Sequence, residues 1–187
     1  MDRRSERHQA TRSEILATAW SLTTEKGLTG WSLRELAAAV GMRAPSLYVY
    51  FGAKDHIYDA MFGDSYRALL ELSMATPLPD EPRERLRTIA ATFFDFAVEN
   101  PARLQLMFWR VVPGFEPSAD AYAPSLQVMD LGRKAFAEIG ITDPAAMDMW
   151  SALLSGLVSQ QASNDPGGDR WRRLIDDAVD MFAAVYL

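Results

Sequence analysis

The sequence of 187 residues predicts an all-α fold. Apolar residues recur with helical spacing along most of the chain, no segment shows the alternation expected of a strand, and proline or glycine separates successive periodic segments. From these observations we expect an N-terminal three-helix domain that a long fourth helix joins to a C-terminal helical domain. We place the two domains at residues 1–56 and 57–187.

The chain opens with a strongly polar segment, residues 2–12 (DRRSERHQATR). It lacks the apolar side chains needed to pack against other elements, so we expect it to begin disordered. Its basic residues Arg3, Arg4 and Arg7 leave two interpretations open. They could reach a minor groove or phosphates, as basic arms do, or they could simply solubilise the chain.

A short helix of about two turns is expected after Ser32, a residue type that favours the N-cap. Its apolar stripe has the spacing i, i+3, i+4 and i+7 and consists of Leu33, Leu36, Ala37 and Val40. Gly41 follows the last of these residues and can adopt the left-handed conformation that ends a helix. The chain can therefore turn sharply at this point.

The next helix should begin near Ala44, with Pro45 in its first turn, where a missing N–H costs nothing. Its core side would hold Leu47, Tyr50 and Phe51, with the Tyr50 hydroxyl at the edge in solvent, and its outer side Ser46, Tyr48 and Val49. Two helices joined by such a tight turn have the geometry of a DNA-binding helix-turn-helix, in which the second helix enters the major groove. A generic helical hairpin shares the pattern, so spacing alone leaves both interpretations open.

The remaining elements follow from apolar periodicity and from helix breakers. One helix is expected from about Ala53 to Ala75, a rod of roughly 33 Å. Further helices are expected at about 81–99, 101–111, 120–139, 144–163 and 168–186, with breaks at Pro82, Asn100-Pro101, Pro113-Gly114, Gly140 and residues 165–168.

The segment Thr11–Phe62 resembles the N-terminal domain of the TetR/AcrR family of one-component transcriptional regulators. The matching residues are Ile15-Leu16, Ala19, Gly27, Ser32, Leu36-Ala37, Gly41-Met42, Ser46-Leu47-Tyr48, Tyr50-Phe51, Lys54-Asp55 and Ile57. The resemblance implies a ligand-responsive DNA-binding regulator that binds a near-palindromic operator as a homodimer and is released by a small-molecule effector. Repression is the family's common mode, and activation stays open.

The resemblance also implies which residues contact DNA. Regulators of the family hold phosphates at the positions of Ser32, Ser46, Tyr48 and Lys54, and all four residue types are present here. Arg43 and Ala44 depart from the family's usual residues. Arg43 could bind guanine O6 and N7 or clamp a phosphate, whereas Ala44 and Pro45 offer only apolar contact, for instance to a thymine methyl. Tyr50 completes the set of expected DNA-binding residues.

Charge is distributed in agreement with this interpretation. Residues 1–56 hold eight Lys and Arg against six Asp and Glu, a balance of +2, and residues 57–187 hold eleven against nineteen, a balance of −8, which together give the net charge of −6. An acidic protein can bind DNA when a local basic surface meets the phosphates. We therefore expect affinity for DNA to fall steeply with salt.

The resemblance implies an effector pocket within the C-terminal domain. Bulky and methionine side chains crowd there, and Met surfaces adapt to varied ligands. The candidate pocket residues are Phe93, Phe96, Met107, Phe108, Arg110, Trp150, Leu154 and Gln160. An inward Asp95 would favour a cationic effector and an inward Arg110 an anionic one, so the sign of its charge stays open.

The last two helices carry wide apolar stripes. In the family these helices pair with their twofold mates, and an isologous dimer would set two recognition helices about 34–36 Å apart, to match successive major grooves. The candidate interface residues are Leu157, Trp171, Leu174, Ile175, Ala178 and Phe182. The alternative is that these stripes form core within one chain.

Enzymatic function is not expected. Cysteine is absent and the only histidines are His8 and His56, so the usual nucleophile-base pairs and metal sets cannot be assembled, and we expect no cofactor and no metal. A carboxylate pair such as Asp95 and Glu99 is ordinary on a solvated helix. No apolar run approaches the roughly 20 residues of a membrane span, and we expect a cytoplasmic protein. The competing hypothesis is a helical ligand-binding or protein-interaction module without sequence-specific DNA binding.

Overall fold

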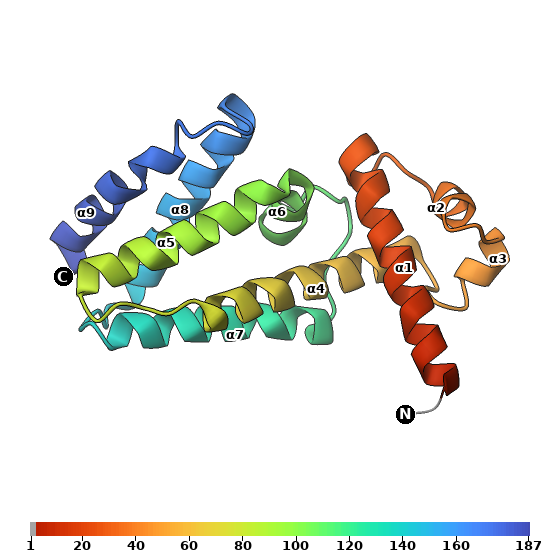
Figure 1. The fold of residues 1–187 in the computed structure, drawn as a ribbon, viewed down its shortest axis with the longest axis horizontal. Coiled ribbons are helices and arrows are strands. Elements are labelled where there is room, and N and C mark those ends of the chain that lie inside the picture. Colours follow the sequence, from red (N-terminus) through yellow and green to blue (C-terminus); the bar gives the residue numbers. More distant parts are fainter. Residues whose placement is uncertain (1–2) are drawn as a thin grey trace. The chain divides into compact units, whose positions relative to one another are not determined.

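The computed structural model describes residues 3–187, and within this range every regular element is a helix (Figure 1). The first helices are α1 (Arg3–Lys26), α2 (Leu33–Ala39), α3 (Ala44–Leu47) and α4 (Lys54–Ala75). They are followed by α5 (Pro82–Glu99), α6 (Pro101–Phe108), α7 (Ala119–Ala137), α8 (Pro144–Asn164), the 3-10 helix η1 (Arg172–Leu174) and α9 (Ile175–Tyr186). The predicted all-α fold is confirmed. Over the same residues, no helix combines the length and the apolar character needed to cross a bilayer.

Two compact units can be distinguished by their internal contacts. Unit 1 contains the chain up to Ser65 together with Gln105–Tyr122, and unit 2 contains Tyr66–Leu104 and Ala123–Leu187. Along the chain, the boundary between the units falls inside α4 and within α6 and α7. The functional division between residues 1–56 and 57–187 stays a prediction.

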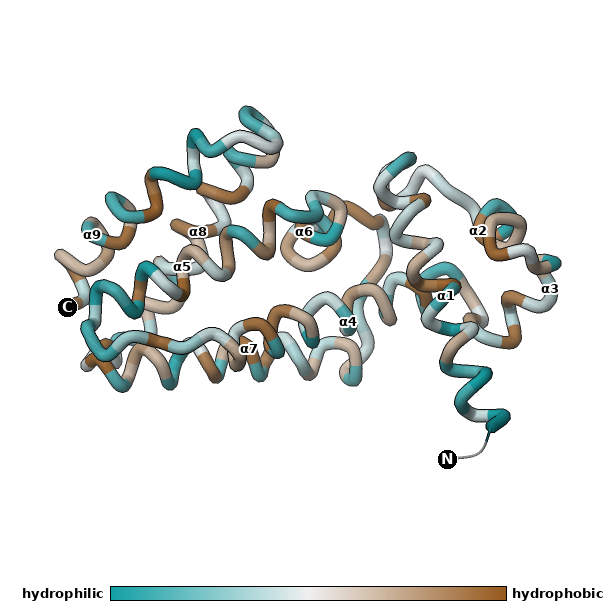
Figure 2. Tube along the Cα trace, viewed as in Figure 1, coloured by the Kyte–Doolittle hydropathy of each residue, from teal (hydrophilic) through white to brown (hydrophobic). Residues whose placement is uncertain are grey.

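Unit 1 is built around an apolar core to which each of its first four helices contributes. The most deeply buried side chains in this core are Ile15, Ala19, Leu36, Leu47, Phe51, Ile57 and Met61. In contrast, the first turns of α1 are hydrophilic, as Figure 2 shows. The core therefore fixes α2 and α3 against α1 and α4 and leaves the N-terminal turns of α1 in solvent.

Aromatic and polar contacts along α4 complete unit 1. The indole Nε1 of Trp31 donates to Thr23 Oγ1 at 2.9 Å, and the Tyr58 hydroxyl donates to the carbonyl of Leu28. Burial raises the pKa of Tyr58 to about 12, so this hydroxyl keeps its proton. On the other side of Tyr58 lies Phe115, whose ring centroid is 5.7 Å away. These contacts hold the loop between α1 and α2 to the start of α4.

Unit 2 packs α5, α8 and α9 against one another. Its core includes an aromatic cluster in which the Trp150 ring lies 5.5 Å from Phe136 and 4.8 Å from Phe182. Gln161 is buried at the end of α8, where its amide donates to the carbonyl of Gly168 at 3.1 Å and accepts from the backbone N–H of Trp171 at 2.9 Å. The Gln161 side chain therefore orders the turn that leads into α9.

The structure corrects several expected boundaries. Residues 3–12 are helical rather than disordered, because extending a helix that is already anchored adds a hydrogen bond per residue without a new nucleation cost. Residue 2 lies outside the described range. The helix expected at 168–186 starts only at Ile175, after η1, because Gln161 and Asp165 hold residues 168–171 in a turn. The helix expected at 101–111 ends at Phe108.

Candidate nucleic-acid interface

The N-terminus of α2 is fixed by a reciprocal cap. Ser32 Oγ accepts from the backbone N–H of Glu35 at 3.2 Å, and Glu35 Oε2 accepts from the backbone N–H of Ser32 at 2.8 Å. Lys26 Nζ donates to Glu35 Oε1 at 2.7 Å, and this contact, together with the bonds from Ser32, lowers the pKa of Glu35 to about 2. Glu35 is therefore ionised at neutral pH and ties α2 to the end of α1.

The turn after α2 depends on Gly41, whose φ of +75° lies in the left-handed region. The Gly41 N–H donates to the carbonyl of Ala38 at 3.1 Å, and the Met42 N–H donates to that of Ala37 at 2.8 Å. These bonds use carbonyls that the end of α2 leaves open. The predicted helix-turn-helix is thus present, with Gly41 at its turn.

The second helix of the motif is shorter than expected. Regular α-helix covers Ala44–Leu47, and residues 48–50 continue as turns. The Phe51 N–H donates to the carbonyl of Leu47 at 3.0 Å and the Tyr50 N–H donates to the same carbonyl at 2.9 Å. The helix can end here because Leu47 and Phe51 are both buried and anchor the segment to the core.

The outer side of this segment is available for contacts. Tyr48 exposes 52% of its surface, and Val49, Ser46, Pro45 and Arg43 are at least partly exposed as well. Arg43 occupies the N-cap of α3, where its side chain makes no capping hydrogen bond. Its five N–H donors can therefore turn toward a base edge or a phosphate. The expected inward side of Leu47 and Phe51 and the outward side of Ser46, Tyr48 and Val49 are confirmed.

The side chain of Lys54, the first residue of α4, is held by contacts within the chain. Its Nζ donates to the carbonyl of Trp31 at 2.5 Å and to that of Thr29 at 3.5 Å, and it lies 4.1 Å from the centroid of the Trp31 ring. Partial burial lowers the pKa of Lys54. An ammonium carries three donors, and the two carbonyls leave one of them for a phosphate. Lys54 therefore links the loop before α2 to α4.

The eight residues that were expected to bind DNA lie close together in sequence within unit 1. They are Ser32, Arg43, Ala44, Pro45, Ser46, Tyr48, Tyr50 and Lys54. Ser32 is exposed, although its hydroxyl also donates to Glu35 Oε2 at 2.8 Å. Tyr50 is only half-buried and its ring stacks on His8. Their assignment as DNA contacts stays a prediction.

Comparison with known proteins identifies the family. The model described as "Tetracyclin repressor-like, C-terminal domain" matches residues 86–183, which is more than half of the chain. The chain belongs to the TetR family. The model of bacterial regulatory proteins of the tetR family matches residues 15–61, the helices that carry the helix-turn-helix.

Curated relatives of this TetR-family chain are transcriptional regulators. The regulator Rv1816 of Mycobacterium tuberculosis is 28% identical over 102 residues, 53% of this chain and 44% of the relative. The repressor NicS of Pseudomonas putida is 25% identical over 100 residues, 52% of this chain and 47% of the relative. The matched region thus spans less than half the length of either relative.

Solved structures share the fold over nearly the whole chain. The regulatory protein SCO4313 superposes with a TM-score of 0.82 at 21% identity, covering 98% of this chain and 100% of that one. AibR, solved in complex with isovaleryl coenzyme A and operator DNA, has a TM-score of 0.68 at 20% identity and covers 94% of this chain and 98% of its own. These likenesses concern the fold.

The candidate effector residues are divided between the two units. Met107, Phe108 and Arg110 belong to unit 1, and Arg110 exposes 92% of its side chain, 3.9 Å from Glu116. The candidates in unit 2 are Phe93, Phe96, Trp150, Leu154 and Gln160. Of these, Phe96, Trp150 and Leu154 are buried in the packed core, whereas Gln160 is exposed and accepts from Asn164 at 2.6 Å.

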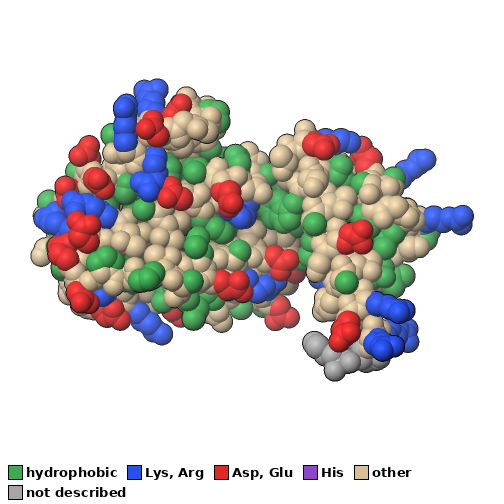
Figure 3. Space-filling model, viewed as in Figure 1, with side chains coloured by type: hydrophobic (Ala, Val, Ile, Leu, Met, Phe, Trp, Pro, Cys, Tyr) green, Lys and Arg blue, Asp and Glu red, His purple; other side chains and the backbone are tan. Residues whose placement is uncertain are grey.

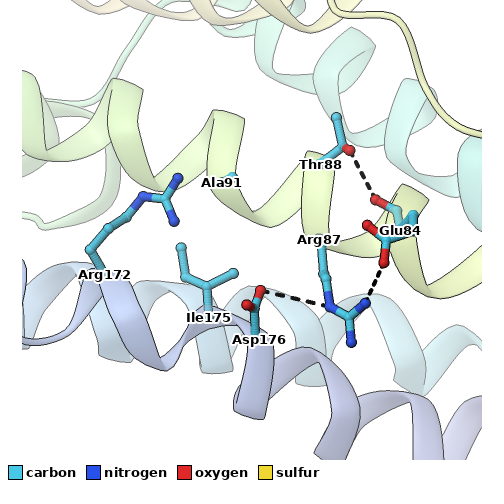
Figure 4. A pocket seen from close by; sticks show the side chains of 7 residues that line it. All are labelled: Glu84, Arg87, Thr88, Ala91, Arg172, Ile175 and Asp176. Carbon is cyan, nitrogen blue, oxygen red and sulfur yellow. Dashed lines mark hydrogen bonds and ion pairs between the residues drawn. The ribbon is translucent and has the colours of Figure 1, made fainter.

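An open groove of about 380 Å³ lies between α5 and the η1–α9 segment (Figure 4). It is lined by Glu84, Arg87, Thr88, Ala91, Arg172, Ile175 and Asp176, none of which was a candidate effector residue. Its guanidinium groups are already paired, because Arg87 contacts Asp180 at 2.9 Å and Arg172 contacts Asp95 at 2.6 Å. Asp95 therefore binds an arginine of this chain rather than facing inward as a handle for a cationic effector.

Three of the residues expected at a dimer interface are covered within the chain itself. Ile175, Ala178 and Phe182 are buried within the chain, because α9 turns this stripe toward α5 and α8. Leu157, Trp171 and Leu174 are half-buried. The outer side of α9 instead exposes Met181 by 69% and Val185 by 74%. Apolar periodicity identifies a buried face, but it does not say whether the same chain or a partner covers it.

Sequence reasoning also missed two residues that contact the segment after α3. The His8 ring stacks on Tyr50 with centroids 4.8 Å apart, and Arg12 Nη1 donates to the carbonyl of Tyr50 at 3.1 Å. A signal exists in the four-residue spacing of Arg4, His8 and Arg12, which puts one side chain per turn on the same side of a helix. A disordered segment has no helical faces, so the expectation of disorder gave no reason to group these side chains by helical spacing.

Proposed function

We propose that this protein is a ligand-responsive transcriptional regulator, in the repressor mode, that binds a near-palindromic operator as a homodimer and is released by a small-molecule effector. The observation that carries the proposal is the helix-turn-helix at residues 32–54, with Arg43, Ser46 and Tyr48 on the outer side of a segment whose inner side is anchored in the core. We propose no catalytic role for it.

Phosphate contacts would come from hydroxyl and ammonium donors of the motif. We propose Ser32, Ser46, Tyr48 and the remaining N–H of Lys54 as backbone contacts, which position the protein without reading sequence. Arg43, Ala44 and Pro45 would face base edges. Tyr50 would lie at the edge of this contact surface. Support comes from the solvent access of Arg43, Ser46 and Tyr48.

Selection of bound duplexes from a random DNA pool tests the operator. A symmetric consensus with two half-sites about 34–36 Å apart is the expected result, because two recognition helices would enter successive major grooves. Recovery of no enriched sequence, even at low ionic strength, would favour a helical module without sequence-specific DNA binding.

The effector would act by linkage between two sites. A hundredfold release from DNA requires about 2.7 kcal/mol of coupling, and DNA must weaken effector binding by the same factor. The five candidates in unit 2, Phe93, Phe96, Trp150, Leu154 and Gln160, lie on α5 and α8. An effector that reached the buried Phe96, Trp150 and Leu154 would have to separate these packed helices.

Acyl coenzyme A thioesters are suitable first probes, since AibR was solved with one. Release of the selected operator at micromolar probe, together with a rise in the midpoint of thermal unfolding, is the expected result. A diverse ligand panel that produces neither effect would refute an effector pocket.

The homodimer would form through the exposed sides of α8 and α9. On α8, Met149, Ala152 and Gly156 are exposed and share one side at helical spacing. On α9, Met181 and Val185 are exposed one turn apart. Exposed apolar residues that gather into one patch mark surfaces that a partner covers. We therefore propose these two stripes in place of the buried one.

A further inference from the structure

The N-terminal turns of α1 form a basic surface that the helix-turn-helix does not account for. Residues 3–8 contain Arg3, Arg4 and Arg7 against the single carboxylate of Glu6, and all of these residues are exposed. Figure 3 shows blue side chains grouped at this end of the helix. The turns reach beyond the apolar core, whose first buried residue in α1 is Ile15.

This end of α1 is braced against the segment that follows α3. The His8 and Tyr50 rings stack at 4.8 Å with 29° between their planes. One turn further along, Arg12 donates to the Tyr50 carbonyl at 3.1 Å, and its guanidinium lies 4.1 Å from the centroid of the Phe51 ring. The exposed turns of α1 are therefore held beside the segment that carries Tyr48 and Val49, within the same unit.

Helical geometry then locates the arginines. Arg4 precedes His8 by four residues, so it lies on the same side of α1 and about 6 Å further along the axis. Arg3 has the same relation to Arg7, on the adjoining side. The arginines therefore form a basic surface that begins next to the Tyr50 contact and follows α1 toward its N-terminus.

We propose that Arg3, Arg4 and Arg7 form a second phosphate-binding surface, which extends the DNA interface of the helix-turn-helix along the flank of the operator. The inference rests on the proposed function. DNA is the occupant that fits, because the surface is basic and adjoins the exposed residues of the recognition segment.

The test compares two triple variants of the full chain on the duplex selected from the random pool. One variant carries Arg3→Gln, Arg4→Gln and Arg7→Gln. The matched control carries Arg133→Gln, Lys134→Gln and Arg173→Gln, exposed positions elsewhere on the surface that change the net charge equally. Glutamine and arginine have similar helix propensities, and circular dichroism would verify that α1 is retained.

Affinity is measured by fluorescence anisotropy at a series of salt concentrations, on the operator and on a scrambled duplex. The N-terminal triple variant should bind both duplexes at least about tenfold more weakly than the parent. Its slope of log affinity against log salt should become shallower by about 0.9 for each phosphate that the variant no longer neutralises. The ratio between operator and scrambled duplex should not change, because phosphates carry no sequence information.

Each alternative result overturns the proposal in a different way. Binding by the N-terminal variant that matches the control triple would show that the arginines only solubilise the chain. A falling ratio between operator and scrambled duplex would indicate base reading in the minor groove instead of phosphate contact. A parent that prefers no duplex would remove the proposed function itself, which separates that failure from failure of the basic surface.

A variant pair tests the brace independently of charge. His8→Ala removes the stack on Tyr50 and should reproduce part of the loss of affinity, whereas His8→Phe keeps an aromatic ring and should restore parental binding. Equal affinity of His8→Ala and the parent would show that the position of the arginines does not depend on Tyr50.

Discussion

Lys54 combines a contact within the fold with a proposed contact to DNA. The charge-assisted bond to the Trp31 carbonyl and the position over the Trp31 ring hold the ammonium in place before any DNA is bound. An ammonium fixed in this way loses less side-chain entropy when a phosphate arrives. The sequence cannot distinguish a lysine held in this way from a lysine that is free in solvent. Only the structure shows that Lys54 is held.

Lys54→Ala should therefore weaken both stability and DNA binding. Loss of the bond and of the ring contact should lower the free energy of unfolding by about 1–2 kcal/mol, measured by urea denaturation. Affinity should fall equally for all sequences, and the salt slope should become shallower by about one unit per subunit contact. Tyr48→Phe is the control, because removal of its exposed hydroxyl should cost about 1 kcal/mol per subunit in DNA binding and nothing in stability. Parental behaviour of Lys54→Ala in both assays would contradict this account.

Glu35 gives the helix-turn-helix a predictable response to acid. The bonds from Lys26 and Ser32 lower its pKa from 4.5 to about 2 in the folded protein. Its contribution to stability is thus fully present above about pH 4.5, the value in the unfolded chain, and is lost as the pH falls toward 2. Glu35→Gln can keep the reciprocal cap but removes the charge. The difference in unfolding free energy between parent and variant should shrink over this interval, and a difference that is constant with pH would refute the assignment.

At the scale of elements, the starts of α2, α5, α6 and α8 were well predicted from the sequence. Pro82, Pro101 and Pro144 each stand at the first position of a helix, and Ser32 caps α2 as expected. The end of α3, the start of α9 and the covered faces of the last helices were predicted less well. The short α3 and the late start of α9 depend on tertiary anchors, the burial of Phe51 and the amide of Gln161, which local propensity does not contain.

The turn between α2 and α3 should be sensitive to the residue at Gly41. A Cβ there would meet no atom within 4 Å, so the effect of substitution should come from the backbone conformation alone. Gly41→Ala should lower the free energy of unfolding by about 1–2 kcal/mol, since the left-handed conformation places Cβ close to the following carbonyl oxygen. Gly41→Asn should cost less, because asparagine visits this conformation more readily. Thermal unfolding monitored by circular dichroism would measure both, and equal stability of the two variants would count against the backbone explanation.

At the scale of the whole molecule, the distribution of apolar surface argues for a partner. The side chains of Ile175, Ala178 and Phe182 are buried within the chain, whereas those of Met181 and Val185 are exposed to solvent. On α8 the corresponding exposed stripe contains Gly156, where an added Cβ would meet no atom within 4 Å. Because this side of α8 is exposed in a single chain, a second copy of the chain could approach it closely.

Gly156→Arg should therefore convert the proposed dimer into a folded monomer. The side chain has room in one chain, yet an isologous interface on this side of α8 would have to accommodate two added arginines, one from each subunit. Light scattering after size exclusion should give twice the chain mass of 20.9 kDa for the parent and a single mass for the variant. Gly156→Ser is the control and should remain dimeric. The monomer should also lose the operator, because one recognition helix cannot occupy both half-sites. A Gly156→Arg protein that stays dimeric would exclude this side of α8 from the interface, and a monomeric parent would exclude the dimer altogether.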